Sequence, residues 1–534
     1  MVQKNGYFSN LEKLVSSTNS FLKDIYINFC NKNIHDKSSL IIGSFLENCT
    51  NLLILKIDLS CNKIGVQGAL EITKSLIKCK NLKKLDLNLS CNQISSLQGL
   101  GSSLAQCYNL SNLTLGFKSN KIDDEGTQIL GFSLAKHINI LNSEISLQES
   151  KQTNQDSSQE QLASTNIQKL SLDLSNNKIG AKGVQGLCDY FTNCKNLSSF
   201  TLKLYANKIN PEGASILGSS FAKCSNLEIL ELDLGGNKIG DEGAQSICFN
   251  LVKCNNLSNL ILNFFSNNIN AVGAKGLGSS LSNCINLNSL NIRIDRNLFG
   301  SQGALNLFSD LSNCSNLSNF YLELNQNQIG DEGIANLGSC LAKCSNIQNL
   351  VLKIFYNQIG SQGMSSLGSS LSKITNLSNL RLDISGNQIG EDGAQGFSQS
   401  FQNFMNLSNL NLTFNDNSIN DKGAQSLFSS LKNCTYLQKL TLTLCRNSFG
   451  DQGIQVLGFS LMNCKNLLYL NLNFCDNLIS GQGVLSLGSS LRKCIFIQKL
   501  YIDFRSNRIK KALKKAFQNQ CLKLMRLIIK SINL

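Results

Sequence analysis

The chain is poor in several residue types that carry catalysis or separate domains. Its 534 residues include one Pro (Pro211), no Trp and two His, His35 and His137. A single Pro excludes Pro-rich linkers. Neither His is placed near an obvious nucleophile in the sequence, so His-dependent catalysis is not expected. The phosphate-loop pattern G-x-x-x-x-G-K-[ST] is absent as well, and no cofactor or metal is expected.

Long apolar stretches are also missing. No charge-free apolar run of about 20 residues occurs, so no membrane-spanning helix is expected. Residues 1–14 contain Lys4, Glu12 and Lys13 and lack an apolar signal core, which disfavours secretion. We therefore expect a cytoplasmic protein, with a nuclear location as the alternative.

The sequence instead has a period of 30 residues. With the first residue of each unit counted as position 0, positions 4, 6 and 8 are apolar, as in Leu170, Leu172 and Leu174. This alternation predicts a strand whose apolar side faces a core. A fixed period of this length predicts a solenoid of stacked units. We count sixteen units, which begin at Phe21, Asn51, Asn81, Asn109 and Asn166 and then every 30 residues to Phe496.

Two further positions and a helical pattern complete the unit. Position 11 is Asn in fifteen of the sixteen units, where an amide can bond the backbone of an inward turn. Position 14 is mostly Gly or Asn, as in Gly180 and Asn210, which predicts a turn with positive φ. Apolar residues then recur at helical spacing, as in Val184, Leu187 and Phe191. Strands stack about 4.8 Å apart and helices are about 10 Å wide, so the strands should line a concave face and the helices a convex one.

Most of the 21 cysteines are explained by the period. Twelve fill one repeat position, and Ile374 and Phe404 replace Cys there, which indicates a buried apolar site. Reduced core thiols suit the cytosol or nucleus. The twelve are Cys49, Cys79, Cys107, Cys194, Cys224, Cys254, Cys284, Cys314, Cys344, Cys434, Cys464 and Cys494.

The repeated pattern L-x-L-x-L-x-x-N, followed by a helix with G-x-x-x-L, resembles leucine-rich repeats of the ribonuclease-inhibitor-like class over residues 21–508. The Asn- and Gln-rich composition also resembles the 30-residue repeat families of ciliates. The resemblance implies an α/β leucine-rich-repeat solenoid, a horseshoe, that acts as a non-enzymatic protein–protein interaction scaffold or adaptor on its concave face. Two alternatives are a Ran-type GTPase-activating or other regulatory protein, and the sensor part of a larger receptor or kinase system. The basic C-terminus departs from the acidic tail of the Ran-type family.

The sequence divides into four parts. Residues 1–20 are predicted to form an N-terminal capping helix, and residues 21–508 the repeat array. A polar, flexible insertion rich in Ser, Gln, Asn and Thr is predicted at about 142–165. Residues 509–534 carry seven basic residues and no acid, which is half of the net charge of +14. This segment is predicted to be a basic cap, with a calmodulin-like or anionic partner as the alternative. Nucleic acid is not expected, because the basic charge is terminal and lacks interleaved aromatics.

Positions 5, 7, 9 and 10 of each unit are predicted to face solvent on the strand side. Most hold small polar residues, but large ones gather in the middle and later units. Aromatic and Arg side chains are the usual anchors of protein interfaces, although isolated exposed aromatics are also ordinary surface. The candidate protein-binding residues are Tyr205, Phe265, Arg293, Arg296, Tyr321, Lys353, Phe355, Tyr356 and Arg381.

Two pairs of cysteines lie off the core position. Cys61 and Cys91 share position 10 of adjacent units, and Cys445 and Cys475 share position 9. A metal site needs about four ligands, and no His is near either pair by phase, so neither pair predicts a metal site.

Overall fold

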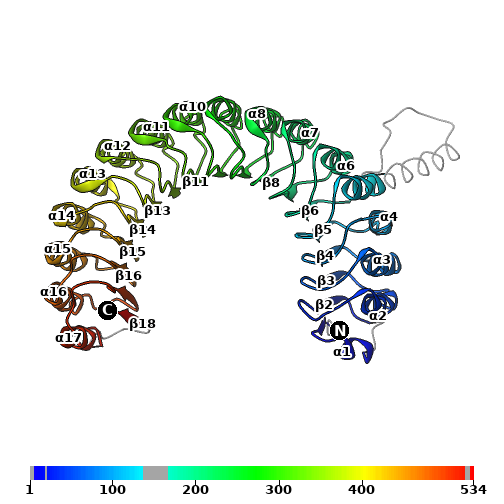
Figure 1. Ribbon diagram of the computed structural model, residues 1–534, viewed down its shortest axis with the longest axis horizontal. Coiled ribbons are helices and arrows are strands. Elements are labelled where there is room, and N and C mark those ends of the chain that lie inside the picture. Colours follow the sequence, from blue (N-terminus) through cyan, green and yellow to red (C-terminus); the bar gives the residue numbers. More distant parts are fainter. Residues whose placement is uncertain (1–4, 18–20, 136–165, 523–528) are drawn as a thin grey trace. The chain divides into compact units, whose positions relative to one another are not determined.

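The computed structural model describes residues 5–17, 21–135, 166–522 and 529–534, so the predicted insertion at about 142–165 lies outside the described residues. The chain forms two compact units, residues 1–267 and 268–534. In each unit all strands are parallel and pair in chain order, and helices cover one side of the sheet. Within each unit the strands lie on the inner side of the bend and the helices on the outer side (Figure 1). The predicted solenoid of parallel strands and outer helices is confirmed for both.

Unit 1 holds the strands β1 to β9. Its elements are β1 (Asn5–Phe8), α1 (Leu11–Val15), β2 (Asp24–Asn28), α2 (Asp36–Glu47), β3 (Ile54–Asp58), α3 (Val66–Ser75), β4 (Lys84–Asn88), α4 (Leu100–Ala105), β5 (Asn112–Gly116), a helix over 124–135, β6 (Lys169–Asp173), α6 (Ala181–Phe191), β7 (Ser199–Lys203), α7 (Pro211–Phe221), β8 (Ile229–Asp233), α8 (Gly240–Leu251) and β9 (Asn259–Asn263).

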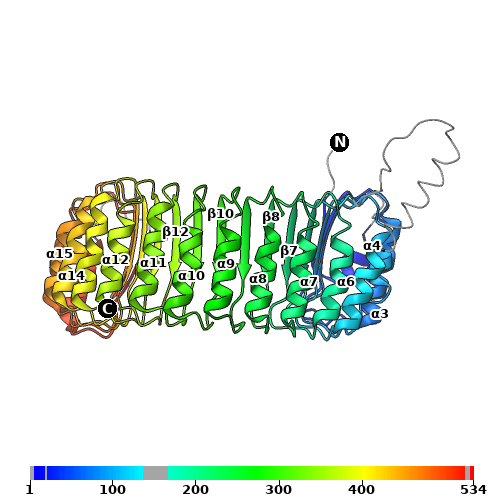
Figure 2. The ribbon, with the colours of Figure 1, turned by 90° about the horizontal axis from the view of Figure 1, so that it is seen from above.

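Unit 2 holds the strands β10 to β18, and its helices lie side by side, as Figure 2 shows for α10, α11 and α12. Its elements are α9 (Ala271–Leu281), β10 (Ser289–Arg293), α10 (Gly300–Leu311), β11 (Asn319–Glu323), α11 (Gly330–Lys343), β12 (Asn349–Lys353), α12 (Ser361–Leu371), β13 (Asn379–Asp383), α13 (Gly390–Ser398), β14 (Asn409–Thr413), α14 (Asp421–Ser430), β15 (Lys439–Thr443), α15 (Asp451–Leu461), β16 (Tyr469–Asn473), α16 (Gly481–Leu491), β17 (Lys499–Asp503), α17 (Lys511–Leu522) and β18 (Ile529–Asn533).

The sixteen strands β2–β17 match the sixteen predicted repeats. Positions 4, 6 and 8 are buried in these strands, as in Leu170, Leu172 and Leu174. Pairing continues past each five-residue strand, because the amides of positions 8 and 10 also donate to the next strand. Leu174 N donates to Lys203 O at 2.8 Å and Asn176 N to Tyr205 O at 2.7 Å.

The Asn column at position 11 forms the predicted ladder inside the turns. Asn62 Nδ2 donates to Phe29 O (2.8 Å) and Leu59 O (2.9 Å), and its Oδ1 accepts from Ile34 N at 2.9 Å. The same contacts recur at Asn237, whose Nδ2 donates to Leu204 O at 2.9 Å. One amide thus satisfies buried backbone groups on two neighbouring repeats, so the column is structural.

The prediction of positive φ at position 14 is only partly right. Gly240, Gly300 and Gly330 have φ near +60°, at 61°, 60° and 60°. Gly180 and Asn210 have φ of −114° and −103°, a conformation open to any residue. The position that is left-handed in all sixteen repeats is position 10, which is Gly only twice. Because this conformation recurs everywhere, it belongs to the repeat and not to one site.

The column of twelve cysteines is buried as predicted, apart from Cys494, which is partly exposed. The thiols bond helix carbonyls; Cys49 Sγ, for example, donates to Phe45 O at 3.3 Å. Burial raises the pKa of several of them, Cys49 and Cys434 to about 12, so these thiols stay protonated at neutral pH.

The two ends of the described chain differ from one another. The predicted N-terminal helix is instead a strand, β1, which pairs in parallel with β2, and the five-residue helix α1. At the other end, α17 buries Phe517 and Cys521, and the Phe517 ring stacks on Phe504 at 6.4 Å. β18 pairs with β17. Among the described helices, none has the length and apolarity to cross a membrane.

Candidate functional site

The strand face, which we define as the sheet surface turned away from the helices, carries the candidate residues. In unit 1 these are Tyr205 and Phe265, both partly buried, with ring centroids 6.4 Å apart. The Tyr205 ring lies over Gly235, where an added Cβ would come within 2.9 Å of it. Beside them, Lys203 Nζ pairs with Glu231 Oε1 at 3.0 Å.

In unit 2 a buried carboxylate organises three of the candidates. Position 7 places Arg293, Glu323 and Lys353 opposite one another on β10, β11 and β12. Arg293 Nε donates to Glu323 Oε2 at 3.0 Å, and Lys353 Nζ to Glu323 Oε1 at 2.5 Å. The Tyr321 hydroxyl donates to the same Oε1, and Lys353 Nζ lies 5.3 Å from the Tyr321 ring centroid. We call these four residues the charge cluster.

Two carboxyl groups in this region have opposite pKa shifts. Burial alone would raise the pKa of Glu323, but hydrogen bonds from Arg293, Lys353 and Tyr321 outweigh it and lower the pKa to about 2. Asp295 is 6% exposed, and burial raises the pKa of its carboxyl to about 6, with the charge of Glu323 adding to the shift. Glu323 is therefore ionised at every physiological pH, whereas Asp295 titrates at about pH 6.

Asp295 and Asn325 hold the backbone next to the cluster. In other repeats an Asp or Asn at position 7 accepts from the position 9 amide of its own strand, as Asp173 does from Ser175 N at 3.0 Å. Glu323 and Lys353 do not serve this role. Instead, Asp295 Oδ1 accepts from Asn325 N at 2.9 Å, and Asn325 Oδ1 from Phe355 N at 3.0 Å. The polar residues of position 9 thus free position 7 for the charge cluster.

Phe355 and Tyr356 form an aromatic corner next to the charge cluster. Their rings meet edge to face with centroids 5.8 Å apart. Tyr356 is 55% exposed and Phe355 half-buried. Tyr356 has φ of 53°, and its ring lies against Gly386 of the next repeat, whose φ is 64°. The candidate Arg296, also left-handed, donates from Nε to Gln326 Oε1 at 2.8 Å.

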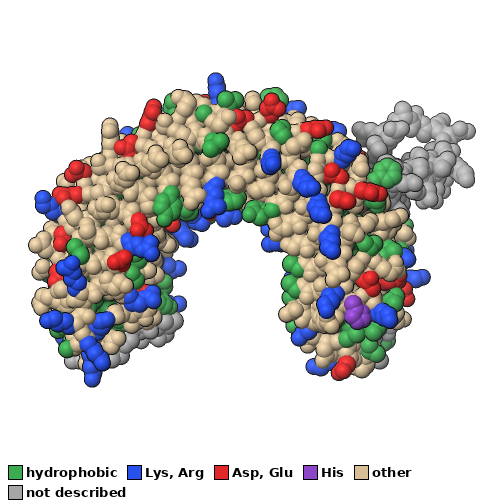
Figure 3. All heavy atoms as spheres, in the orientation of Figure 1, with side chains coloured by type: hydrophobic (Ala, Val, Ile, Leu, Met, Phe, Trp, Pro, Cys, Tyr) green, Lys and Arg blue, Asp and Glu red, His purple; other side chains and the backbone are tan. Residues whose placement is uncertain are grey.

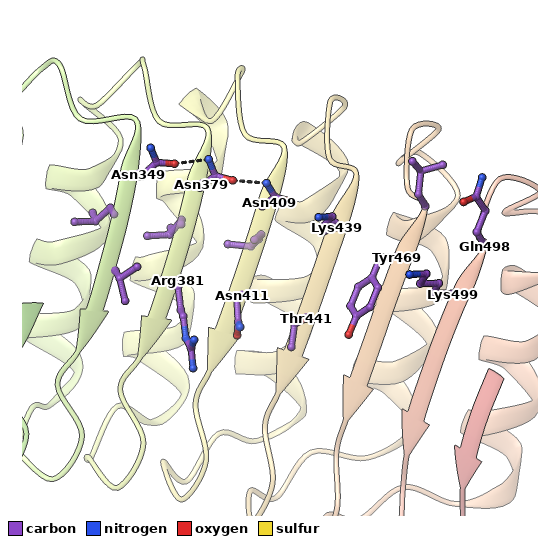
Figure 4. Close-up of a pocket in the computed structure, with 15 residues that line it drawn as sticks. Asn349, Asn379, Arg381, Asn409, Asn411, Lys439, Thr441, Tyr469, Gln498 and Lys499 are labelled. Atoms are coloured by element: carbon purple, nitrogen blue, oxygen red, sulfur yellow. Dashed lines mark hydrogen bonds between the residues drawn. The ribbon is translucent and has the colours of Figure 1, made fainter. Parts of the chain in front are cut away.

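Further along unit 2 the strand face is hollowed into a groove of about 690 Å³ across β12–β17 (Figure 4). Position 3 of three neighbouring strands places Lys439, Tyr469 and Lys499 in one row, with Arg381 at position 5 of β13. The side chains of Arg381, Lys439 and Lys499 are exposed, and their charged groups make no hydrogen bond or ion pair with the described residues. No carboxylate lines the hollow. We call it the cationic groove.

The groove floor is ordered by amides at its β12 end. Asn379 Nδ2 donates to Asn349 Oδ1 at 2.5 Å, and Asn409 Nδ2 donates to Asn379 Oδ1 (Figure 4). Asn349 continues the row to Asn319 Oδ1 at 2.6 Å. Such ladders fix side-chain conformation and consume the amide donors.

The structure therefore sorts the nine candidates into separate groups. Tyr205 and Phe265 belong to unit 1. Arg293, Tyr321 and Lys353 surround Glu323, Phe355 and Tyr356 form the aromatic corner, Arg296 binds Gln326, and Arg381 lines the groove. Sequence reasoning missed Glu323 and Asp295, and it missed Lys439, Tyr469 and Lys499 because position 3 was not counted among the solvent-facing positions. The 30-residue spacing of Arg293, Glu323 and Lys353 was a readable signal.

The cysteines outside the core column also have neighbours. Ser60 Oγ donates to Cys30 Sγ at 3.3 Å, which places Cys30 near Cys61 and Cys91. Cys445 and Cys475 both donate to Asn473 Oδ1, at 3.1 and 3.0 Å. Within the described residues, no group of three or more His, Cys, Asp or Glu side chains is placed to hold a metal ion.

On the face turned to the viewer in Figure 3, most of the surface of unit 2 is neutral, with many basic and several acidic side chains distributed over it singly or in small groups. The basic helix α17 turns its apolar residues Phe517 and Cys521 inward, which supports the cap interpretation. A calmodulin-like partner for this helix stays a prediction.

Comparison with known proteins identifies the type of repeat. Six segments match a family model described as "Leucine Rich repeat": residues 49–72, 169–188, 225–248, 321–338, 376–398 and 405–428. No curated protein sequence matches the chain. The fold is similar to a solved leucine-rich-repeat protein of Leptospira interrogans, with a TM-score of 0.52 and 17% identity over 99% of this chain and 100% of that one.

Two further solved structures are more distant. One is a plant peptide hormone receptor, RGFR1, in complex with RGF2. It has a TM-score of 0.39 and 16% identity, over 99% of this chain and 80% of that one. An internalin of Listeria monocytogenes has a TM-score of 0.40 and 17% identity, over 92% and 88%. The six matched repeats and the strand–helix architecture show that the chain folds as a leucine-rich-repeat solenoid. Its place in the ribonuclease-inhibitor-like class stays a prediction.

Proposed function

We propose that the chain is a non-enzymatic interaction protein that binds a protein partner through the strand face of unit 2. Leucine-rich-repeat folds commonly serve as protein–protein interaction scaffolds. A pre-formed sheet loses little conformational entropy on binding, which favours recognition by a rigid surface. The contact residues we propose there are Arg293, Arg296, Tyr321, Lys353, Phe355, Tyr356 and Arg381, with Tyr205 and Phe265 as a second contact surface in unit 1.

The aromatic corner is the observation that carries the proposal. Tyr356 is 55% exposed, yet it rests against Gly386 and meets the Phe355 ring at 5.8 Å. An exposed aromatic that is already held in place loses few rotamers when a partner covers it. The neighbouring charge cluster supplies polar groups whose positions are fixed by Glu323, as is usual at the rim of an interface.

We also propose a reducing compartment, the cytoplasm or the nucleus, for this activity. All 21 cysteines are free, and Cys61 and Cys91 are exposed. Neighbouring exposed thiols of this kind persist where glutathione keeps thiols reduced.

The test is affinity capture of partners by the tagged full chain and by the variant Phe355→Ala/Tyr356→Ala. The control is Tyr436→Ala/Phe459→Ala, which removes two exposed aromatics, 64% and 53%, that lie outside the strands. We expect proteins that the wild type and the control retain and the corner variant loses, with affinity lowered by more than about 1 kcal/mol in calorimetry. Equal capture by all three chains would contradict the proposal.

A further inference from the structure

We propose that the cationic groove of unit 2 is a docking site for an extended acidic peptide segment of a partner protein. This inference rests on the proposed function and names the chemistry of the ligand. It concerns a different part of the strand face from the aromatic corner, so the two can be tested separately.

Charge complementarity is the first argument. Arg381, Lys439 and Lys499 are exposed, have no carboxylate partner among the described residues, and line a hollow without any acid. Three other cations of this face are paired with carboxylates: Arg293 and Lys353 with Glu323, and Arg505 with Asp503 at 2.7 Å. The groove thus gathers three basic side chains with no acid among its lining residues, which attracts carboxylates and repels cations.

Spacing is the second argument. Lys439, Tyr469 and Lys499 occupy the same position on β15, β16 and β17, so the two Lys lie two strands apart. Parallel strands about 4.8 Å apart put these side chains about 10 Å apart. A polyproline II peptide rises about 3.1 Å per residue with three residues per turn, so carboxylates at every third residue face one side about 9.3 Å apart. Such a peptide matches the row if it crosses the strands.

The lining between the cations favours a peptide over a nucleic acid. The Tyr469 ring lies between the two Lys in the row (Figure 4). Tyr501 lies beside it, with ring centroids 5.5 Å apart. Val351 and the 38% exposed Leu468 extend the apolar surface. Polyproline II segments dock on aromatic surfaces of this kind. A nucleic acid would gain more from several interleaved aromatics, and the groove row offers one.

Asn411 supplies a hydrogen-bonding reason as well. Its Oδ1 is buried at the groove lining and accepts no hydrogen bond from the described residues. A backbone N–H of a bound peptide can donate to this oxygen once the half-buried Asn411 side chain turns toward the groove. The Asn349–Asn379–Asn409 ladder holds the adjoining floor in place, because its amides bond one another.

The experiment measures binding of a fluorescein-labelled peptide with Glu at every third residue and Pro between, by anisotropy with the full chain. The variant Arg381→Glu/Lys439→Glu/Lys499→Glu reverses the groove charges. The control Lys373→Glu/Lys465→Glu reverses two exposed cations outside the groove. We expect the groove variant to bind at least about tenfold more weakly, the control to be nearly unchanged, and wild-type binding to weaken as salt rises. The milder pair Lys439→Gln/Lys499→Gln should lower affinity in the same direction.

Three results would overturn the proposal. One is no binding of the spaced peptide by the wild-type chain. Another is equal binding of a peptide with the same composition but its Glu residues in one block, or of the Gln analogue. The third is tighter binding of a labelled single-stranded oligonucleotide, abolished by the groove variant, which would assign the groove to nucleic acid.

Partner capture separates this inference from the proposed function. If the corner variant loses partners and the wild-type chain does not bind the spaced peptide, protein binding stands and the acidic-peptide site is wrong. If the peptide binds the groove but neither variant loses a protein, the site stands as a peptide-binding surface and the aromatic corner is wrong.

Discussion

The charge cluster and the cationic groove lie on the same strand face, and both present basic side chains from neighbouring strands, yet their cations differ in availability. Arg293 and Lys353 converge on Glu323, whose side chain is only 8% exposed. Arg381, Lys439 and Lys499 converge on no carboxylate. One buried acid at the centre of a row turns a basic patch into a structural network. The number of cations on a surface therefore does not measure its capacity to bind an anion.

The largest effect is expected from removing the central acid. Glu323→Ala should cost about 2 to 3 kcal/mol of unfolding free energy, because it leaves two partly buried cations without a partner. The matched change Glu231→Ala in unit 1 breaks an exposed pair, with side chains 38% and 32% exposed, and should cost less than about 1 kcal/mol. Urea unfolding with hydrogen exchange of each repeat measures both. If both variants lowered the unfolding free energy by the same amount, burial of Glu323 would not make its ion pairs stronger than the exposed pair of Glu231.

Acid should reproduce part of that loss. The pKa of Glu323 is lowered from 4.5 to about 2. The stability that the ionised carboxylate adds to the folded chain is therefore complete above about pH 4.5 and is lost as the pH falls toward 2. The Glu323→Ala chain should show no such loss from this group.

Asp295→Asn should change stability in the opposite direction. The pKa of Asp295 is raised from 3.8 to about 6, so the folded chain keeps this proton when the unfolded chain has lost it, and stability falls as pH rises from about 4 to 6. Asn cannot ionise and still accepts from Asn325. The variant should therefore be more stable by about 1 to 2 kcal/mol above pH 6 and equal to wild type below pH 4. A constant difference across this range in thermal melts would contradict the raised pKa.

The period made the fold readable from the sequence, since every repeat buries the same positions in the same environment. The Asn column and the Cys column follow from that, as does the strand–helix alternation. The pairing of Arg293 with Glu323 was also readable, because residues 30 apart are neighbours once the period is known. The raised pKa of Asp295 could not be predicted from the sequence, since it depends on how deeply the folded chain buries this carboxyl. The left-handed position 10 was hidden because non-Gly residues such as Asn176 and Tyr356 occupy it.

Gly386→Ala should disturb the aromatic corner by a smaller amount. Ala must adopt the left-handed φ of 64°, and its Cβ would meet the Tyr356 ring. The neighbouring repeats hold Asp416 and Arg446 in this conformation, so the backbone contribution is only about 1 kcal/mol. The ring should move, which a change in Tyr fluorescence or in partner affinity would report. Gly300→Ala, where nothing lies within 4 Å of the added Cβ at a similar φ of 60°, is the control. Equal effects of both changes on partner affinity would show that the ring contact is not part of the interface.

The smallest effect on stability is expected in the groove, and it completes the comparison with the cluster. Lys439→Gln/Lys499→Gln should change unfolding free energy by less than about 0.5 kcal/mol, because neither side chain has a partner among the described residues to lose. Arg293→Gln/Lys353→Gln should cost more, since it leaves Glu323 buried with fewer donors. Acidic-peptide affinity should respond in the reverse order, falling for the groove pair and hardly changing for the cluster pair. A groove pair that destabilises as much as the cluster pair would mean that its cations already serve the fold, and they would then not be free to bind a ligand.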